Sequence, residues 1–276
     1  MKIETQLRFY KPFATLTPEM HYSGYVVTDG SWHQEPLYAS YSRLYYVTHG
    51  SGMLVSENEK MPLEPGYVYL VPCGIKCGFY GTPSVTKLFF HINLSVNGEG
   101  CEGSDAFESF GHFSRLPRSV EYIEKLKDWY LGNGSESENY GYLMLKSEII
   151  KTVCDFLRTK EVRSEKTETY SKAVADAMRY VRSHITATLT VKSVAEAALC
   201  SQSKLSALFK AELGQSVSSY IEDILMSEAQ TQLMYSDLSV GQISEKLGFC
   251  DQFYFSRRFK KRFGVPPKEF KKSQSV

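Results

Sequence analysis

The C-terminal part of the chain contains two copies of one short segment, separated by 50 residues. Identical residues at this offset are Cys200/Cys250, Gln202/Gln252, Ser206/Ser256, Phe209/Phe259, Lys210/Lys260 and Gly214/Gly264. Two further pairs, Leu205/Phe255 and Leu213/Phe263, keep an apolar residue at the same place. Such a repeat predicts that this region folds as two copies of one small helical unit.

Each copy has the start and stop signals of a helix, a turn and a second helix. In the later copy Ser239 and Gln242 have the spacing of a capping box, and Gly248 permits the turn. Asp251 can cap the next helix, which Gly264 ends. The earlier copy has a helix at 191–199, a cap at Ser201 or Ser203, and a stop at Gly214. This order predicts two helix-turn-helix units.

Charge separates the same region from the rest of the chain. The 276 residues carry a formal net charge of only +1. Residues 1–169 hold 17 Lys and Arg against 21 Asp and Glu, whereas residues 170–276 hold 15 against 10. From residue 246 onward the balance is 9 against 2. A basic C-terminal end favours polyanion binding, although a solvated basic tail would have the same composition.

The second helix of the later copy combines an aromatic face with a basic one. Phe255, Phe259 and Phe263 recur every four residues and are expected to face the core. The remaining surface is rich in Arg and Lys, as suits a helix in the major groove of DNA, although a solvated amphipathic helix is the alternative. The lysines expected to contact phosphates in the two copies are Lys204, Lys210, Lys260 and Lys261.

Up to about residue 95 the sequence is typical of short strands. Runs of β-branched and aromatic residues, punctuated by Gly and Pro, lie at 25–27, 44–47, 52–55, 66–72 and 87–94. Many short strands at this spacing predict a sandwich or a barrel.

Two helices are expected next, at 119–131 and 139–158. The apolar residues of the second helix cover more than one face; they are Leu143, Leu145, Ile149, Ile150, Val153 and Phe156. One stripe could pack on the strands and another on a second subunit, or all could belong to one core. Residues 159–169 contain a single apolar residue, Val162. We therefore expect domains at 1–160 and 170–276, joined by a linker at 161–169.

Residues 170–272 resemble the AraC-type (AraC/XylS) DNA-binding domain. The most specific part is the continuous segment 248–270, which begins with Gly248-Phe249 and ends with Pro266-Pro267-Lys268-Glu269-Phe270. The resemblance implies seven helices, with the two helix-turn-helix units joined by a long helix at 217–235. The two recognition helices would then enter successive major grooves on one face of the duplex.

By position, the resemblance also implies which residues face the bases. They are Ser203, Ser206, Ala207, Gln252, Phe253, Ser256 and Arg257. Phe253 departs from the family, which usually has a small or polar residue there, and could contact a thymine methyl group. Ala207 can neither donate nor accept a hydrogen bond, so readout at its position would be apolar.

The N-terminal half resembles the AraC-type sensor domain, in the segments 45–52, 63–72 and 89–92. The resemblance implies a cupin-like β-barrel followed by a two-helix dimerisation hairpin. The expected fold class is therefore α+β, with this barrel and hairpin ahead of an all-α domain that holds two helix-turn-helix units. A closed barrel of this size can hold one small ligand.

The strand at 87–94 has one apolar face and one mixed face. Because side chains alternate along a strand, Lys87, Phe89 and His91 share the mixed face. Polar groups beside aromatic rings suit a carbohydrate-like ligand. The candidate pocket residues are Trp32, His33, Tyr46, Tyr80, Lys87, Phe89 and His91, and core packing is the alternative for each of them.

The sequence contains no pattern typical of a metal-dependent cupin enzyme. His21, His33, His49 and His91 stand alone, without the close His and carboxylate spacing of a metal site. The six cysteines are scattered and are interpreted as reduced thiols. We therefore expect no catalytic residues, no metal and no cofactor. No run of about 18 apolar residues is present, so we expect no membrane partner.

Together these patterns predict a cytoplasmic, nucleoid-associated transcription regulator. Its expected partners are double-stranded DNA, a small-molecule effector for which a sugar is the working hypothesis, a second copy of the chain, and RNA polymerase. One alternative is a DNA-binding regulator without a ligand, controlled by its abundance or by a partner protein. Another is a cupin enzyme. Activation and repression are both left open.

Overall fold

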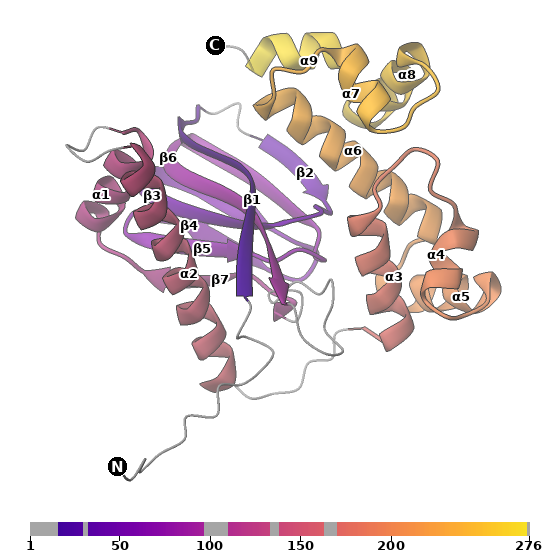
Figure 1. Cartoon of the computed structure of the whole chain (residues 1–276), viewed down its shortest axis with the longest axis horizontal. Coiled ribbons are helices and arrows are strands. Elements are labelled where there is room, and N and C mark those ends of the chain that lie inside the picture. The colour runs from indigo at the N-terminus through magenta and orange to yellow at the C-terminus, as the bar shows by residue number, and fades with distance from the viewer. Residues whose placement is uncertain (1–15, 30–32, 97–109, 133–137, 163–169, 275–276) are drawn as a thin grey trace.

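The computed structural model describes residues 16–29, 33–96, 110–132, 138–162 and 170–274. A strand-rich N-terminal part lies beside a group of helices formed by the C-terminal part (Figure 1). The described strands are β1 (Leu16–Val27), β2 (His33–Leu37), β3 (Ser42–Val55), β4 (Lys60–Leu63), β5 (Tyr67–Val71), β6 (Cys77–Val96) and β7 (Ser114–Pro117).

The seven strands form one antiparallel sheet in the order β1-β6-β3-β5-β7, with β2 paired to β6 and β4 to β3. The separate runs expected at 44–47 and 52–55 are two parts of the single strand β3. An irregularity lies between them at Gly50, where φ is +80° and a Cβ atom would lie 2.0 Å from the carbonyl oxygen of Ser84. In the described residues the sheet does not close, so the α+β class is confirmed but the word barrel applies only loosely.

One face of the sheet is covered by α1 (Val120–Tyr130) and α2 (Glu138–Val162) (Figure 1). Ser119 caps α1 by accepting a hydrogen bond from the backbone N–H of Tyr122. The core on this side joins Leu44 and Phe90 from the sheet to Ile123 and Val153 from the helices. Helix α2 continues through residues 159–162, where the expected linker begins, and residues 163–169 lie outside the described part of the chain.

Seven helices follow, as the resemblance implies: α3 (Lys172–Ser183), α4 (Val191–Ala197), α5 (Gln202–Leu213), α6 (Val217–Tyr235), α7 (Val240–Lys246), α8 (Gln252–Phe263) and α9 (Pro267–Gln274). The first half of α6 shares a core with α3–α5, and its second half shares a core with α7–α9. Helix α6 therefore holds both helix-turn-helix units. No helix in the described ranges is long and apolar enough to cross a membrane.

The loop between β2 and β3 packs against α6. Tyr38 is 4% exposed and belongs to the core around α3–α5. Its ring lies 4.8 Å from that of Tyr220 in an edge-to-face arrangement. Further along the loop, Ser40 donates a hydrogen bond to Glu228 on α6. The helix that carries the two helix-turn-helix units thus also contacts the sheet.

Candidate DNA-binding surface and interdomain cavity

The later helix-turn-helix unit consists of α7, a turn and α8. Ser239 and Gln242 form the expected capping box at the start of α7. Gly248 has φ of +76°, and a Cβ atom there would lie 2.3 Å from the hydroxyl of Thr186. Asp251 then caps α8 by accepting from the backbone N–H of Tyr254 at 2.8 Å. The two caps and the positive φ of Gly248 are short-range signals, whereas the close approach of Gly248 to Thr186 joins positions that are distant in the sequence.

The earlier unit, α4 and α5, has a turn that is one residue shorter. Four residues, 198–201, separate its helices, whereas five, 247–251, separate α7 and α8. The offset between copies is consequently 50 for the second helices but 49 for the first. Helix α4 ends at Ala197, two residues before the expected end, and Leu199 takes φ of +52° in the turn. Ser201, and not Ser203, caps α5.

Helix α8 divides its basic residues between two surroundings. Arg258 forms an ion pair with Glu222, and Arg262 lies 3.0 Å from Asp223; both acids belong to α6. These pairs hold α8 against the long helix, together with the fully buried Phe255. The side chains of Arg257, Lys260 and Lys261 remain exposed. They provide the positive charge that is available to a partner.

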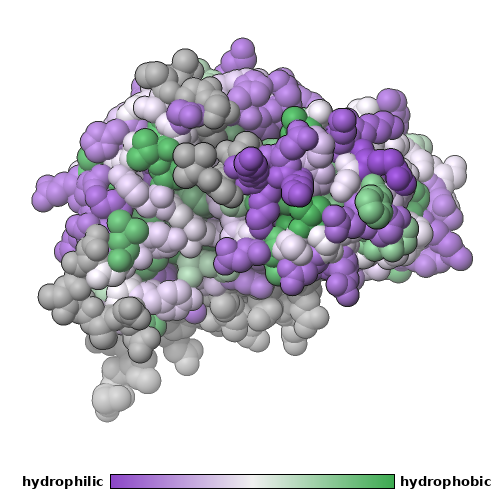
Figure 2. All heavy atoms as spheres, turned by 90° about the horizontal axis from the view of Figure 1, so that it is seen from above, coloured by the Kyte–Doolittle hydropathy of each residue, from purple (hydrophilic) through white to green (hydrophobic). Residues whose placement is uncertain are grey.

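The residues predicted to face the bases lie at or near the surface of α5 and α8. Ser256 is half-buried, and the exposed ones are Ser203, Ser206, Ala207, Gln252, Phe253 and Arg257. Phe253 is 75% exposed, so packing within the chain does not account for it. On the face that carries α7–α9, hydrophilic residues gather over the helices, broken by separate hydrophobic patches (Figure 2). Base contact by these residues stays a prediction.

Of the four lysines expected to contact phosphates, three are exposed, and their ammonium groups have no hydrogen bond or ion pair within the described residues: Lys204, Lys260 and Lys261. The fourth, Lys210, is exposed as well, but its ammonium donates to the carbonyl oxygen of Gly214 at 3.1 Å. It therefore satisfies an end carbonyl of α5. Binding a phosphate would compete with this contact.

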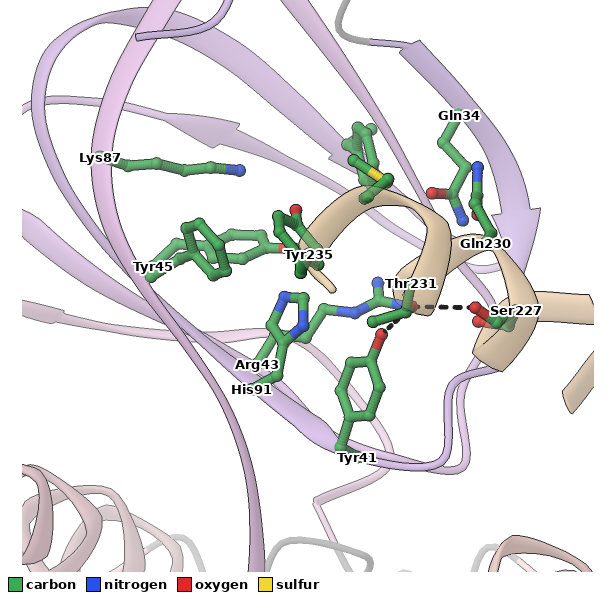
Figure 3. Close-up of a pocket in the computed structure, with 13 residues that line it drawn as sticks. Gln34, Tyr41, Arg43, Tyr45, Lys87, His91, Ser227, Gln230, Thr231 and Tyr235 are labelled. Atoms are coloured by element: carbon green, nitrogen blue, oxygen red, sulfur yellow. Dashed lines mark hydrogen bonds between the residues drawn. The ribbon is translucent and has the colours of Figure 1, made fainter. Parts of the chain in front are cut away.

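A second candidate site is a cavity between the sheet and α6 (Figure 3). Its volume is about 20 Å³, the space of one or two water molecules. The sheet and its loops contribute Gln34, Tyr41, Arg43, Tyr45, Phe79, Lys87, Phe89 and His91. Helix α6 contributes Ser227, Gln230, Thr231, Met234 and Tyr235.

Strand pairing brings the sheet residues of the cavity together. Arg43 lies opposite His91, and Tyr45 opposite Phe89, in the register between β3 and β6. Because side chains alternate along each strand, all four point away from α1 and α2. The ring of His91 stacks on Tyr41, with centroids 4.5 Å apart and planes 11° apart. In Figure 3 the Arg43 side chain extends from its strand toward α6.

The basic side chains of the cavity are buried. Arg43, Lys87 and His91 are at most 5% exposed. Burial lowers the pKa of the Lys87 ammonium, and the nearby charge of Arg43 lowers it further. The same two causes, in the same order, lower the pKa of His91. The Nη1 atom of Arg43 and the Nδ1 atom of His91 have no hydrogen-bond partner among the described residues.

The structure places the predicted pocket residues in different surroundings. Lys87, Phe89 and His91 line the cavity, and their ligand role stays a prediction. Tyr46 does not line it, which corrects the expectation: its hydroxyl donates to Thr152 of α2, because alternation turns it to the helix-covered face. His33 and Tyr80 pack on each other, with ring centroids 4.5 Å apart, and do not line the cavity. Trp32 lies outside the described residues.

Sequence reasoning missed Arg43, Tyr41 and Tyr45 as cavity residues. The sequence does contain a signal for Arg43, because this residue is charged within an otherwise apolar strand. It also lies two positions from Tyr45, so both side chains are on the same face of the strand. Nothing local identifies the contribution of α6. Within the described ranges, no three His, Cys, Asp or Glu side chains are grouped as metal ligands would be. The five described cysteines are free thiols.

Comparison with known proteins gives relatives for both parts of the chain. Residues 194–273 match the family model of a helix-turn-helix domain. The chain is 27% identical over 232 residues to the arabinose operon regulatory protein of Salmonella typhimurium, covering 80% of each. It is 22% identical to the lactose operon transcription activator of Staphylococcus xylosus, covering 85% of each. The crystal structure of an apo single-residue variant of ToxT from Vibrio cholerae is similar in fold: it covers 94% of this chain and 97% of its own, with a TM-score of 0.58 and 15% identity.

Proposed function

We propose, from the premise that this chain is a DNA-binding transcription regulator of the AraC type, that a small molecule bound beneath α6 controls how it binds DNA. One observation carries the proposal: α6 holds both helix-turn-helix units and also lines the cavity. A change at the cavity would therefore act on the element that sets the spacing of the two recognition helices. Such coupling needs only a ligand that binds two arrangements with different affinity.

The size of the cavity supports a change of arrangement on binding. A volume of about 20 Å³ is far below that of sites that hold small molecules. Met234 and Tyr235 of α6 line the cavity, so a ligand of sugar size would need more room than these side chains leave. Binding of such a ligand would therefore shift α6, or the side chains beneath it, away from the arrangement seen here.

The chemistry of the lining supports a hydroxylated ligand. Ser227, Gln230 and Thr231 on α6 offer hydroxyl and amide groups, and Tyr45 and Phe89 offer aromatic surfaces. Rings of this kind can stack on the apolar faces of sugars. Two of the relatives are named for arabinose and lactose operons. A sugar, or a close derivative of one, is the ligand class that we propose.

On the DNA side, the exposed residues of α5 and α8 would enter successive major grooves about 34 Å apart. Arg257 would read base edges, whereas Lys260 and Lys261 would hold phosphates. The ion pairs that Arg258 and Arg262 form with α6 would fix the angle of α8. This division gives the exposed and paired basic residues of one helix different roles.

A dimer is the proposed assembly. Leu145, Ile149 and Val153 of α2 are buried against the sheet. Leu143 is 61% exposed, and Ile150, two turns along the same side, is half-buried. Of the two possibilities that the sequence leaves open, the exposed Leu143 and the half-buried Ile150 support contact with a second subunit.

We expect the protein to act by binding, without catalysis, since its relatives are regulators. Its DNA target would place it in the cytoplasm with the nucleoid. An activating role would also require contact with RNA polymerase. These expectations depend on DNA binding, which a footprint can test directly.

The test is a footprint of the full-length protein on the DNA upstream of its own gene, with and without L-arabinose or lactose. We expect protection over successive major grooves on one face of the duplex, in a pattern that a bound ligand changes. Calorimetric titration of the same protein with each sugar reports binding independently of DNA. The proposal would be contradicted if no site were protected before the protein concentration reaches the level at which it binds DNA non-specifically.

A further inference from the structure

We infer that the effector carries an anionic group, a carboxylate or a phosphate, which Arg43, Lys87 and His91 bind inside the cavity. This inference rests on the proposed function and gives the chemical class of its ligand. The cavity combines three buried basic side chains with lining residues that include no Asp or Glu among those described. An anion would pair with the protonated Arg43 and would favour the protonated forms of Lys87 and His91, so the lining suits an anionic group.

Arg43 supplies the strongest part of the argument. Its guanidinium stays protonated under all ordinary conditions, and removing it from water is costly unless an opposite charge compensates. Yet it is 4% exposed, and no described carboxylate lies within 4 Å of it. Its Nη1 atom has no hydrogen-bond partner in the part of the chain that the structure describes. An anionic oxygen in the cavity would provide both the charge and the acceptor.

His91 adds a second donor at the same place. It lies directly opposite Arg43 in the strand register, and its Nδ1 atom is buried without a partner. Stacking on Tyr41 fixes the plane of its ring. A bound anion would favour the protonated form of His91, against the lowering effect of burial on its pKa. Ligand binding would then be accompanied by proton uptake.

Lys87 extends the basic surface along β6. Its ammonium lies 3.9 Å from the ring centroid of Tyr45, and it is close enough to Arg43 for the two charges to affect each other. The ammonium thus lies over an aromatic ring, and a ligand anion in the cavity could approach the ammonium. Its role in the site is that of an additional positive charge.

Glu228 of α6 lies near the cavity but does not line it. Its carboxylate accepts hydrogen bonds from Tyr22 of β1, from Ser40 of the loop between β2 and β3, and from the amide of Gln232. The α6 residues that do line the cavity are neutral. A ligand that matches both sides therefore has an anionic end toward the sheet and hydroxyl groups toward α6. Sugar acids and sugar phosphates have this combination.

The test uses the full-length protein and pairs of probes that differ in charge but little in shape. Formate is compared with formamide, inorganic phosphate with chloride at equal ionic strength, and D-glucuronate and D-glucose 6-phosphate with D-glucose. The readouts are the melting temperature and calorimetric affinity. The carboxylate and phosphate arms show which anion the site prefers.

We expect saturable stabilisation by at least one charged probe and none by its neutral partner. Arg43→Met should weaken that response at least tenfold, whereas Arg43→Lys should retain part of it. Arg158→Met is the matched control, because this substitution removes the same positive charge at an exposed position of α2, away from the cavity. Far-UV circular dichroism checks that each variant is folded. If Arg43→Met does not fold, His91→Gln takes its place, with the same expected loss.

Three results would overturn the inference: equal stabilisation by charged and neutral probes, an unchanged response in the folded Arg43 or His91 variant, or no response to any charged probe. The footprint separates this failure from failure of the proposed function. A footprint that changes with a neutral sugar would support the proposed function and contradict only the inference that the effector is anionic. Absence of any footprint would contradict the proposed function itself, whether or not the charged probes stabilise the protein.

Discussion

The hydroxyl of Tyr41 donates a hydrogen bond to Oγ1 of Thr231, across 2.5 Å, and so joins the sheet to α6. The direction follows from the neighbouring contact, in which Thr231 donates to the carbonyl oxygen of Ser227 at 2.9 Å. Tyr41 is buried and stacks on His91 of the cavity. This pair of side chains is therefore one direct link between the candidate ligand site and the helix that holds both helix-turn-helix units.

Breaking this link should change both stability and regulation. Tyr41→Phe and Thr231→Val should each destabilise the protein by about 1 kcal/mol, and the double variant should show a coupling of similar size. Urea denaturation measures these free energies of unfolding. Without ligand, both variants should give a DNA footprint shifted toward the liganded pattern, because α6 is released more easily.

Tyr46→Phe is the matched control for that prediction. Its hydroxyl bonds to Thr152 within the N-terminal part, so the variant should lose similar stability but keep the wild-type footprint. A footprint altered equally by all three variants would mean that stability alone, and not the contact with α6, determines the pattern.

The exposed basic residues of α8 should differ in their effect on specificity. Arg257→Ala should weaken binding to the cognate site by about 1 to 3 kcal/mol and relax its sequence preference, because a base contact is lost. Lys260→Ala should weaken binding to all sequences alike and reduce the salt slope by about one, as expected for a phosphate contact. Fluorescence anisotropy titrations at several salt concentrations measure both. Identical behaviour of the two variants would show that the assigned roles are wrong.

The exposed side of α2 should be required for self-association. Leu143→Glu places a charge where a second subunit is expected, so the dissociation constant of the dimer should rise at least tenfold in sedimentation experiments. Stability of the monomer should change by less than about 0.5 kcal/mol, since Leu143 is 61% exposed. Lys151→Glu, at another exposed position of α2, is the control. A wild-type protein that sediments as a monomer at micromolar concentration would refute this assembly.

Stability of the ligand-free protein should fall as the solution becomes acidic. Burial lowers the pKa of His91, and the charges of Arg43, Lys87 and His21 lower it further. Above the unfolded-state pKa of about 6.5 both states hold a neutral ring, so the group has no effect. Below it, the unfolded state takes up a proton that the folded state does not, and stability decreases by up to about 1.4 kcal/mol per pH unit.

Chemical denaturation of the wild type and of His91→Gln between pH 7.5 and 5 measures this effect. The variant should lose less stability over that range, whereas His184→Gln, at an exposed position, should behave like the wild type. Parallel pH profiles for all three proteins would assign the acid sensitivity to other groups.

Local signals explain why the helix-turn-helix units were predictable. Caps such as Ser239 and Asp251 and the turn residue Gly248 act within a few positions, and each appears in the structure as expected. The shorter first turn was not foreseen, because Leu199 has no turn signal and adopts a positive φ only in its structural context. Most of the residues that are identical at an offset of 50 belong to the second helices, α5 and α8. They therefore do not reveal that the first helices, α4 and α7, are offset by 49.

The cavity was predictable only in part. Alternation along β6 correctly grouped Lys87 with His91, since the period of a strand is two. Alternation along β6 alone does not tell which side chains of β3 share the face of Lys87 and His91, and the sequence therefore does not distinguish Tyr45, which lines the cavity, from its neighbour Tyr46. The contribution of Thr231 depends on a contact between positions 190 residues apart, and no local pattern encodes such a contact.

The most direct measurement is selection of bound fragments from random DNA by the full-length protein, followed by affinity measurement on the enriched sequences. We expect enriched fragments with two short conserved elements per protomer, separated by about one helical turn, as two recognition helices on one long helix require. The preference should be at least a thousandfold over random DNA at physiological salt. Fragments enriched without a shared sequence, or bound no more tightly than random DNA, would contradict the account.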